Sequence, residues 1–130
     1  MKEVEDNSIK IDDFKLGRKL GAGKFGEVFI ARHKKSGFMC AIKRINKLNI
    51  DQKLLIQLIR EIKIQSFLTH PNIVKLYTFF CDHQFIYLVL ELCYSGQLYD
   101  YLKKKRKLSE PLTKNIVQQS LKALDYMHEN

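Results

Sequence analysis

Residues 20–28 read LGAGKFGEV, a glycine-rich stretch in which Gly21, Gly23 and Gly26 follow the pattern GxGxxG. Glycine permits both a sharp turn and the close approach of a phosphate to the backbone, because it has no Cβ atom. A dinucleotide-binding turn shares this pattern but opens a helix, whereas residues 27–32 (EVFIAR) have the character of a strand. The stretch therefore predicts a hairpin between two strands that covers nucleotide phosphates, with a merely flexible hairpin as the alternative.

The pattern around this hairpin predicts an α+β fold. The expected strands cover residues 14–20, 27–32, 38–45, 76–81 and 85–92. Apolar residues at helical spacing predict a helix over about residues 51–68, which stops before His70-Pro71, and two further helices after residue 97 and from residue 112 to the end. Short connections favour an antiparallel sheet, so we expect a five-stranded sheet with one packed helix, followed by two helices.

Lys43 and Glu61 are candidate charged residues of one site. Lys43 follows Ala41 and Ile42 in a largely apolar predicted strand, which favours a cation that points inward, although a surface lysine is the commonest case. Glu61 lies about 60° round its predicted helix from Leu58, at the edge of the apolar stripe, so it can reach the sheet. Each residue alone is more simply a solvated charge. Together with the glycine-rich hairpin, the functional interpretation of both residues is favoured.

These three features resemble the small lobe of a eukaryotic protein kinase, and the resemblance extends from about Phe14 to the end of the chain. Residues 20–32 (LGAGKFGEVFIAR) and 60–80 (REIKIQSFLTHPNIVKLYTFF) look most like the Aurora family of serine/threonine kinases, with the polo-like branch next. The resemblance implies transfer of the γ-phosphate of ATP, with Mg²⁺, to serine or threonine of a protein substrate. It also implies an activating protein on the Glu61 helix and a cytoplasmic or nuclear location, at the spindle or centrosome.

The resemblance assigns roles to residues of this chain. In the family a glycine-rich loop covers ATP, a lysine holds its α- and β-phosphates, and a helix glutamate orients that lysine; these catalytic roles carry over to Lys43 and Glu61. Leu90 would stand at the back of the adenine pocket, and Gln97 replaces a glutamate that many relatives have near the ribose. The implied nucleotide-binding residues are Leu20, Gly21, Ala22, Gly23, Lys24, Phe25, Gly26, Val28, Ala41, Lys43, Leu90, Glu91 and Cys93. Of these, Leu20, Val28 and Ala41 would form apolar walls, and the backbones of Glu91 and Cys93 would bond the adenine edge.

The 130 residues contain no HRD and no DFG triplet, which carry the catalytic base and a Mg²⁺ ligand in the family. Residues 126–128 (YMH) resemble the end of the helix that precedes the catalytic loop. We therefore expect a tail over residues 1–13, a small lobe over 14–92, and a hinge with the start of a truncated large lobe over 93–130, inactive by itself. A short non-catalytic protein that binds partners or acts as a decoy is the alternative.

Composition fits one globular domain, because 45% hydrophobic and 28% charged residues exclude a disordered chain. A net charge of +9 favours an anionic partner such as a nucleotide, a nucleic acid or an acidic protein surface. Residues 103–107 (KKKRK) are a possible nucleic-acid patch. They contain no aromatic residue for base stacking, so a solvated loop is preferred and nucleic acid is not the expected partner.

Membrane and metal sites are not expected from this sequence. No apolar run reaches the roughly 18 residues of a membrane helix. The cysteines and histidines lack the spacing of metal ligands. Cys40 and Cys93 lie in apolar runs, so we predict that both are buried free thiols in a reducing compartment.

Overall fold

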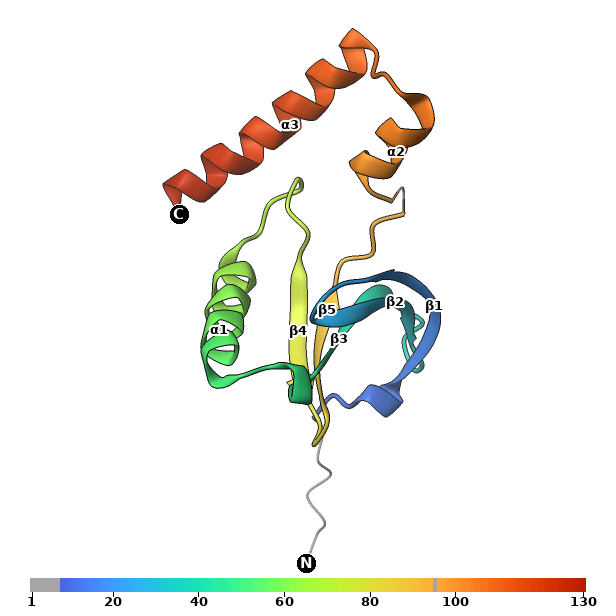
Figure 1. Cartoon of the computed structure of the whole chain (residues 1–130), viewed down its shortest axis with the longest axis vertical. Helices are drawn as coiled ribbons and strands as arrows, with labels where there is room; N and C mark the ends of the chain where they lie inside the picture. The colour runs from blue at the N-terminus through green and yellow to red at the C-terminus, as the bar shows by residue number, and fades with distance from the viewer. Residues whose placement is uncertain (1–7, 95) are drawn as a thin grey trace, which may run out of the picture.

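The computed structural model describes residues 8–94 and 96–130 (Figure 1). Its strands are Phe14–Ala22 (β1), Gly26–His33 (β2), Met39–Asn46 (β3), Leu76–Cys81 (β4) and Phe85–Leu90 (β5), and its α-helices are Gln52–Phe67 (α1), Leu98–Lys105 (α2) and Glu110–Glu129 (α3). Single turns of 3₁₀ helix, Ile11–Asp13 and Lys47–Asn49, lie before β1 and after β3. The predicted elements are confirmed, with ends displaced by one or two residues. Residues 1–7 of the predicted tail lie outside the described residues.

The five strands form one antiparallel sheet in the order β1-β2-β3-β5-β4. Strands β2 and β3 pair in regular register along their whole length, from Gly26 opposite Ile45 to Arg32 opposite Met39. Strands β1 and β2 pair less regularly, with register shifts on both sides of Lys19. The predicted α+β fold with an antiparallel sheet is therefore confirmed, and its least regular pairing lies next to the glycine-rich turn.

Two tight turns join neighbouring strands of the sheet. The turn between β2 and β3 contains Gly37, whose φ of 74° is a left-handed conformation that favours glycine. In the turn between β4 and β5, the Asp82 carboxylate accepts the backbone N–H groups of Gln84 and Phe85 at 2.8 and 2.7 Å. Asp82 also accepts a hydrogen bond of 2.9 Å from the Tyr87 hydroxyl, which ties the turn to the buried face of β5.

Each face of the sheet carries an apolar cluster. The first cluster consists of Phe14, Ala31, Cys40, Ile42, Tyr87 and Val89. The second consists of Ile45, Ile62, Leu76 and Leu88, and it includes the buried residue of α1. Because side chains alternate along β3, Cys40 and Ile42 lie on one face while Ile45 lies on the face that α1 covers. The helix α1 therefore marks the side of the sheet on which a site between strand and helix can form.

Helix α3 is joined to the loop after α1 by side-chain hydrogen bonds. The Thr69 N–H donates to the Tyr126 hydroxyl oxygen at 2.9 Å, and the Asn72 side chain donates to the side-chain carbonyl of Gln119 at 2.9 Å. The buried residue of α3 is Ala123, whereas Val117, Leu121 and Leu124 are exposed. Figure 1 shows α3 beyond the end of the sheet, above the loop that follows α1. None of the helices in the described part of the chain is long and apolar enough to cross a membrane.

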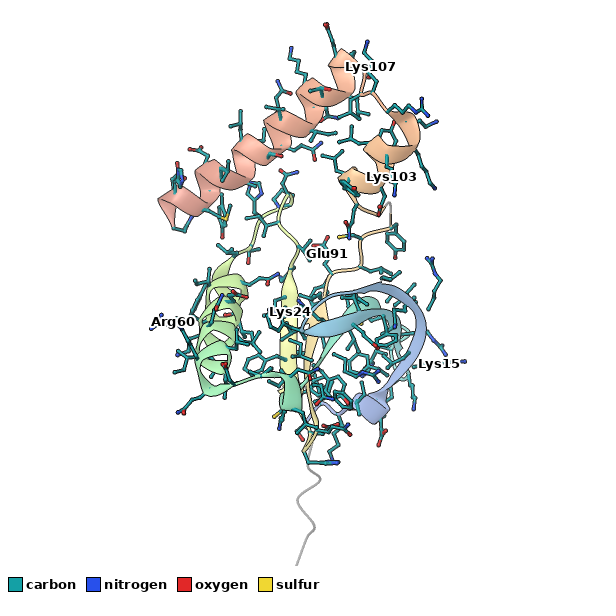
Figure 2. The ribbon with its side chains drawn as sticks, in the orientation of Figure 1. Lys15, Lys24, Arg60, Glu91, Lys103 and Lys107 are labelled. Atoms are coloured by element: carbon teal, nitrogen blue, oxygen red, sulfur yellow. The ribbon has the colours of Figure 1, made fainter. Side chains whose placement is uncertain are left out.

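Two predictions about individual segments need correction. Cys40 is a buried free thiol as predicted, and burial raises its pKa, but Cys93 is exposed because β5 ends at Leu90 and Cys93 lies in the connection to α2. The basic run over residues 103–107 is not wholly a loop, since Lys103 to Lys105 form the last turn of α2. Cations at a helix C-terminus interact favourably with the helix dipole. In Figure 2, Lys103 and Lys107 mark the two ends of this run.

Candidate functional site

The glycine-rich turn joins β1 to β2 and is closed by a hydrogen bond of 2.8 Å from the Gly23 N–H to the Gly26 carbonyl. A Cβ atom at Gly26 would clash with the Arg44 carbonyl oxygen, so the pairing of β2 with β3 itself requires glycine there. A Cβ atom at Gly21 or Gly23 would meet no atom within 4 Å. Packing within the chain does not explain glycine at these two positions. Their bare backbone leaves room for a ligand to approach.

Lys43 lies near the middle of β3, on the face of the sheet that α1 covers. It is directly opposite Val28 on β2 and Leu88 on β5. Ile45, two residues along β3, belongs to the cluster that packs against α1, so Lys43 shares that face by strand alternation. Its side chain is half-buried. The sequence left the face of Lys43 open, and the position of α1 decides it.

Lys43 and Glu61 line the same cavity between β3 and α1. The cavity has a volume of about 90 Å³, and its lining consists of Phe25, Lys43, Ile45, Ile50, Leu54, Gln57, Leu58 and Glu61. Within the described part of the chain no ion pair joins Lys43 to Glu61. Glu61 is exposed and accepts a hydrogen bond of 3.2 Å from the Gln57 side chain, one turn earlier on α1. The structure thus brings the two residues to one cavity and leaves them unpaired.

The apolar residues assigned to an adenine slot lie on four strands. Val28 (β2), Ala41 (β3) and Leu90 (β5) share the face of Lys43, because Val28 is opposite Lys43 and Ala41 is opposite Leu90. Ala41 is buried, and Val28 and Leu90 are half-buried. Leu20, at the end of β1 nearest the turn, is exposed. Three of the four predicted wall residues therefore share one face of the sheet with Lys43.

The segment after β5 is anchored to the start of β4 through Glu91. The Glu91 N–H donates to the Lys75 carbonyl at 2.8 Å, and the Lys75 N–H donates to the Glu91 carboxylate at 3.1 Å. Glu91 lies between the sheet and the two last helices (Figure 2). Its N–H is engaged within the protein, which leaves its carbonyl as the group that can bond a ligand. Gln97 is the residue before α2 and is exposed.

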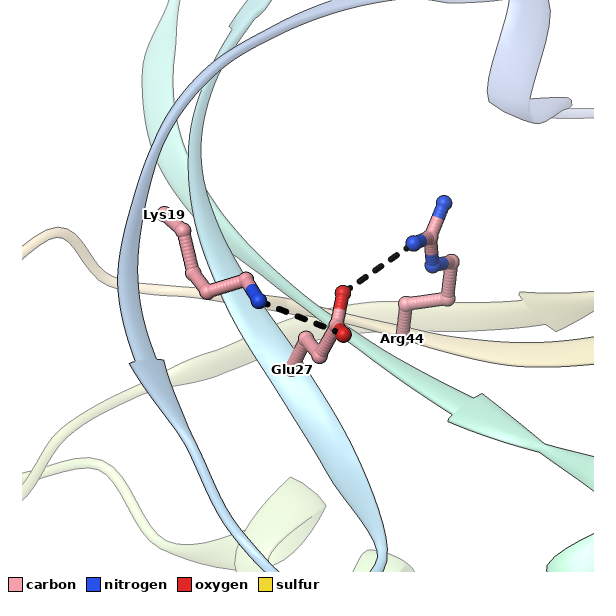
Figure 3. Close-up of polar contacts among 3 residues, drawn as sticks. All are labelled: Lys19, Glu27 and Arg44. Carbon is pink, nitrogen blue, oxygen red and sulfur yellow. Dashed lines mark hydrogen bonds and ion pairs between the residues drawn. The ribbon is translucent and has the colours of Figure 1, made fainter.

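Glu27 is a charged residue beside the turn that sequence reasoning missed. Its carboxylate accepts a hydrogen bond of 3.1 Å from Arg44, and its other oxygen lies 3.3 Å from the Lys19 ammonium (Figure 3). The hydrogen bond from Lys19, with further contributions from Arg44, lowers the pKa of Glu27. The signal in the sequence is weak, because the partners of Glu27 follow from strand register and not from spacing.

The donor groups of this site suit a nucleotide phosphate better than a metal ion. The Lys43 ammonium offers positive charge to phosphate oxygens, and the bare backbone at Gly21 and Gly23 leaves room for them to approach. In the described ranges no group of three or more carboxylates, imidazoles and thiols is placed to hold a metal ion. Among the described residues, the donors at this site thus match the chemistry of a phosphate, and they supply no set of carboxylate ligands for Mg²⁺.

Comparison with known proteins identifies the family. A family model described as "Protein kinase domain" matches residues 14–130. The chain belongs to the protein kinase family. Its sheet with α1 is the small lobe of this kinase domain, and α2 and α3 begin the large lobe. The predicted resemblance to a kinase small lobe is confirmed.

The kinase chain is similar to Aurora kinases, as its motifs predict. It is 46% identical over 129 residues to an Aurora kinase of Candida glabrata, a match that covers 98% of this chain and 36% of the relative. It is 48% identical over 120 residues to Aurora kinase B of Mus musculus, covering 92% and 35% of the two chains. An Aurora kinase of Saccharomyces cerevisiae is 41% identical over 123 residues, covering 94% and 34%. The chain spans about a third of the length of these curated relatives.

Proposed function

We propose that this chain is the ATP-binding part of a serine/threonine kinase that transfers the γ-phosphate of ATP to a protein. One observation supports the proposal: the half-buried Lys43 shares one face of the sheet with Val28, Ala41 and Leu90, and the glycine-rich turn with its bare backbone joins two strands of that sheet. That face therefore offers contacts to phosphates and to a flat apolar base side by side. Bound ATP would supply the phosphoryl group, and the residues below would hold it.

Each assigned residue has a distinct part in holding the nucleotide. The backbone at Gly21 and Gly23 would lie against the phosphates, and the Lys43 ammonium would bond the α- and β-phosphates. Val28 and Ala41 would contact the faces of adenine. The adenine edge would be met by the Glu91 carbonyl and the Cys93 backbone, because the Glu91 N–H already donates to Lys75.

Orientation of Lys43 by Glu61 requires a rearrangement of α1 in this proposal. In the free chain Glu61 bonds Gln57 instead of Lys43. A shift or rotation of α1 toward β3 would close the small cavity between the two residues and form the ion pair. Kinase activity would thereby depend on the position of α1.

An activating protein on α1 is the partner that we propose for this rearrangement. The helix buries Ile62 and exposes several other apolar side chains, namely Leu55, Ile56, Ile59, Ile64 and Phe67. A partner that covers some of these side chains would gain apolar burial and could hold α1 against the sheet. In a longer chain, Ile59→Glu is expected to leave basal transfer unchanged and to remove activation in dividing cells. A location at the spindle or centrosome, imaged with a tagged protein, is part of the same proposal.

The 130 residues by themselves are expected to bind nucleotide without transferring phosphate. They contain neither HRD nor DFG, so neither the family's base nor its metal ligands are available, and positioning and charge stabilisation are most of what a kinase contributes. A short protein that binds partners without catalysis is the competing function. An in-frame continuation of the coding sequence that carries HRD and DFG would exclude it.

Nucleotide binding and phosphoryl transfer test the proposal. The fluorescent analogue mant-ATP is titrated into the 130-residue chain and displaced with ATP, and transfer to a basic peptide is measured with a longer chain that carries HRD and DFG. Lys43→Met keeps the apolar stem and removes the cation, so it is expected to abolish transfer while the fold is retained. Lys53→Met, an exposed lysine of α1, is the matched control. Near-normal transfer by the Lys43 variant, or no binding by the wild-type chain, contradicts the proposed function.

A further inference from the structure

The side chain of Glu27 joins three strands at the base of the glycine-rich turn (Figure 3). Glu27 lies on β2, and its two carboxylate oxygens contact different neighbours. One lies 3.3 Å from the ammonium of Lys19 on β1, and the other accepts a hydrogen bond of 3.1 Å from the guanidinium of Arg44 on β3. A single carboxylate therefore links both strands of the hairpin to the next strand of the sheet.

This linkage lies where the backbone pairing is least regular. The register of β1 against β2 shifts between Leu16 and Lys19 and again between Lys19 and Gly21. The register of β2 against β3 has no shift from Gly26 to Arg32. The register is thus least well determined at the end of β1 that leads into the turn. The Lys19–Glu27 contact links this end of β1 to β2, whose pairing with β3 is regular.

Arg44 is a fixed anchor for this linkage. Its guanidinium carbon lies 4.9 Å from the ring centroid of Phe29 and 4.8 Å from that of Phe85, so two aromatic rings hold the cation in addition to Glu27. Gly26 lets β2 approach the Arg44 backbone closely, because a side chain there would clash with the Arg44 carbonyl. The two aromatic rings therefore hold the Arg44 guanidinium in place independently of its contact with Glu27.

The linkage and the phosphate-facing residues are adjacent positions of the same strand pair. Glu27 is directly opposite Arg44, and the next pair along the two strands is Val28 opposite Lys43. Successive residues of a strand point to opposite faces, so the Glu27–Arg44 contact lies on the reverse side of the strands that carry Val28 and Lys43. The Glu27–Arg44 contact can therefore restrain the position of the turn relative to Lys43 without occupying the face of the sheet that carries Val28 and Lys43.

We infer that Glu27 is a positioning residue that holds the glycine-rich turn in place over Lys43 by bridging Lys19 and Arg44. The inference rests on the proposed nucleotide-binding function for its effect on affinity, but its effect on the turn itself does not need a nucleotide. Exposed ion pairs contribute modestly, so loss of the bridge is expected to weaken nucleotide binding about two- to five-fold.

The experiment measures the turn and the nucleotide separately. Amide hydrogen exchange of the nucleotide-free chain is followed by NMR for residues 21–26, with the Gly23 amide as the reporter, because it donates across the turn. The variants are Glu27→Gln, Lys19→Met and their combination. Lys15→Met is the matched control, since Lys15 is an exposed lysine of β1 that forms no ion pair in the described part of the chain.

The expected result is faster exchange over residues 21–26 in both single variants, with unchanged exchange over residues 85–90. The combined variant should be no faster than Glu27→Gln, because both substitutions remove the same contact. Lys15→Met should match the wild type. Affinity for mant-ATP should fall about two- to five-fold in Glu27→Gln and not in the control.

Two results would overturn the inference. The first is wild-type exchange over residues 21–26 in Glu27→Gln and Lys19→Met. The second is faster exchange with unchanged mant-ATP affinity, which would mean that the turn is restrained without consequence for binding. If the wild-type chain binds no mant-ATP but exchange changes as expected, the restraint on the turn stands and the proposed function fails.

Discussion

Lys43 and Glu61 line one cavity between β3 and α1, yet within the described part of the chain they form no ion pair, and Glu61 is bonded to Gln57. The two charges are therefore independent in the free chain. Nucleotide binding and kinase activation should respond differently to the loss of each charge.

The first prediction separates these two charges. Glu61→Gln in the 130-residue chain is expected to change mant-ATP affinity by less than about two-fold, because an exposed carboxylate without Lys43 as its partner contributes little. Lys43→Met is expected to lower the affinity about ten-fold or more, since a charge-assisted bond to phosphate is lost. Fluorescence titration measures both. Equal losses in the two variants would mean that the pair forms when nucleotide binds.

The second prediction concerns the contact between α3 and the loop after α1. Tyr126→Phe removes the acceptor of the Thr69 N–H and is expected to lower the free energy of unfolding by about 0.5–1.5 kcal/mol, near the lower end because water can reach Thr69. Urea unfolding measures the change. Tyr99→Phe, on the exposed surface of α2, is the control and should leave stability unchanged. A loss of the same size in both variants would mean that the Thr69 contact does not stabilise the fold.

The third prediction concerns the apolar stripe on α3. Val117, Leu121 and Leu124 lie on one side of the helix and are exposed in this chain, a patch that favours association. Leu121→Glu is expected to shift the 130-residue chain toward the monomer in analytical ultracentrifugation. Lys114→Gln changes the net charge by the same amount and should not do so. Monomeric wild-type protein at high concentration would contradict the prediction.

The fourth prediction is a pH dependence that comes from Tyr87. Burial, and the hydrogen bond that its hydroxyl donates to Asp82, raise the pKa of Tyr87 from 10.0 to about 12. The neutral phenol is favoured by folding, so this contribution to stability is complete below pH 10 and is lost as the pH rises through about 12. The difference in tyrosinate absorbance between the wild type and Tyr87→Phe should titrate near pH 12. A difference that titrates near pH 10 would mean that Tyr87 is not held in this way.

Much of the fold was predictable because local chemistry and the observed structure agree. Residues 27–32 have strand character and form most of β2, and the helix that had to stop before His70-Pro71 ends at Phe67. The Ser36-Gly37 pair is typical of a turn because glycine tolerates positive φ, and Gly37 adopts the left-handed conformation between β2 and β3. In these segments a short stretch of sequence determines the local backbone structure.

The remaining features depend on tertiary geometry that no single segment encodes. Which face of the sheet α1 covers decides the surroundings of Lys43, and Glu61 contacts the Gln57 side chain, one turn earlier on α1, instead of Lys43. Glu27 escaped prediction because its partners on β1 and β3 are brought to it by strand register. Cys93 was predicted to be buried because its neighbours are apolar, but the strand ends at Leu90 and the chain turns toward α2.

The three glycines of the GxGxxG stretch meet different surroundings, and a substitution library would divide them accordingly. Any side chain at Gly26 collides with the backbone of β3, so a screen for folded protein is expected to reject substitutions there. Alanine at Gly21 or Gly23 meets open space and should pass the same screen. A second screen, for capture on immobilised ATP, is expected to reject those as well. The glycines of one short motif would then be required for two different reasons: Gly26 for the pairing of the sheet, and Gly21 and Gly23 for binding of the ligand.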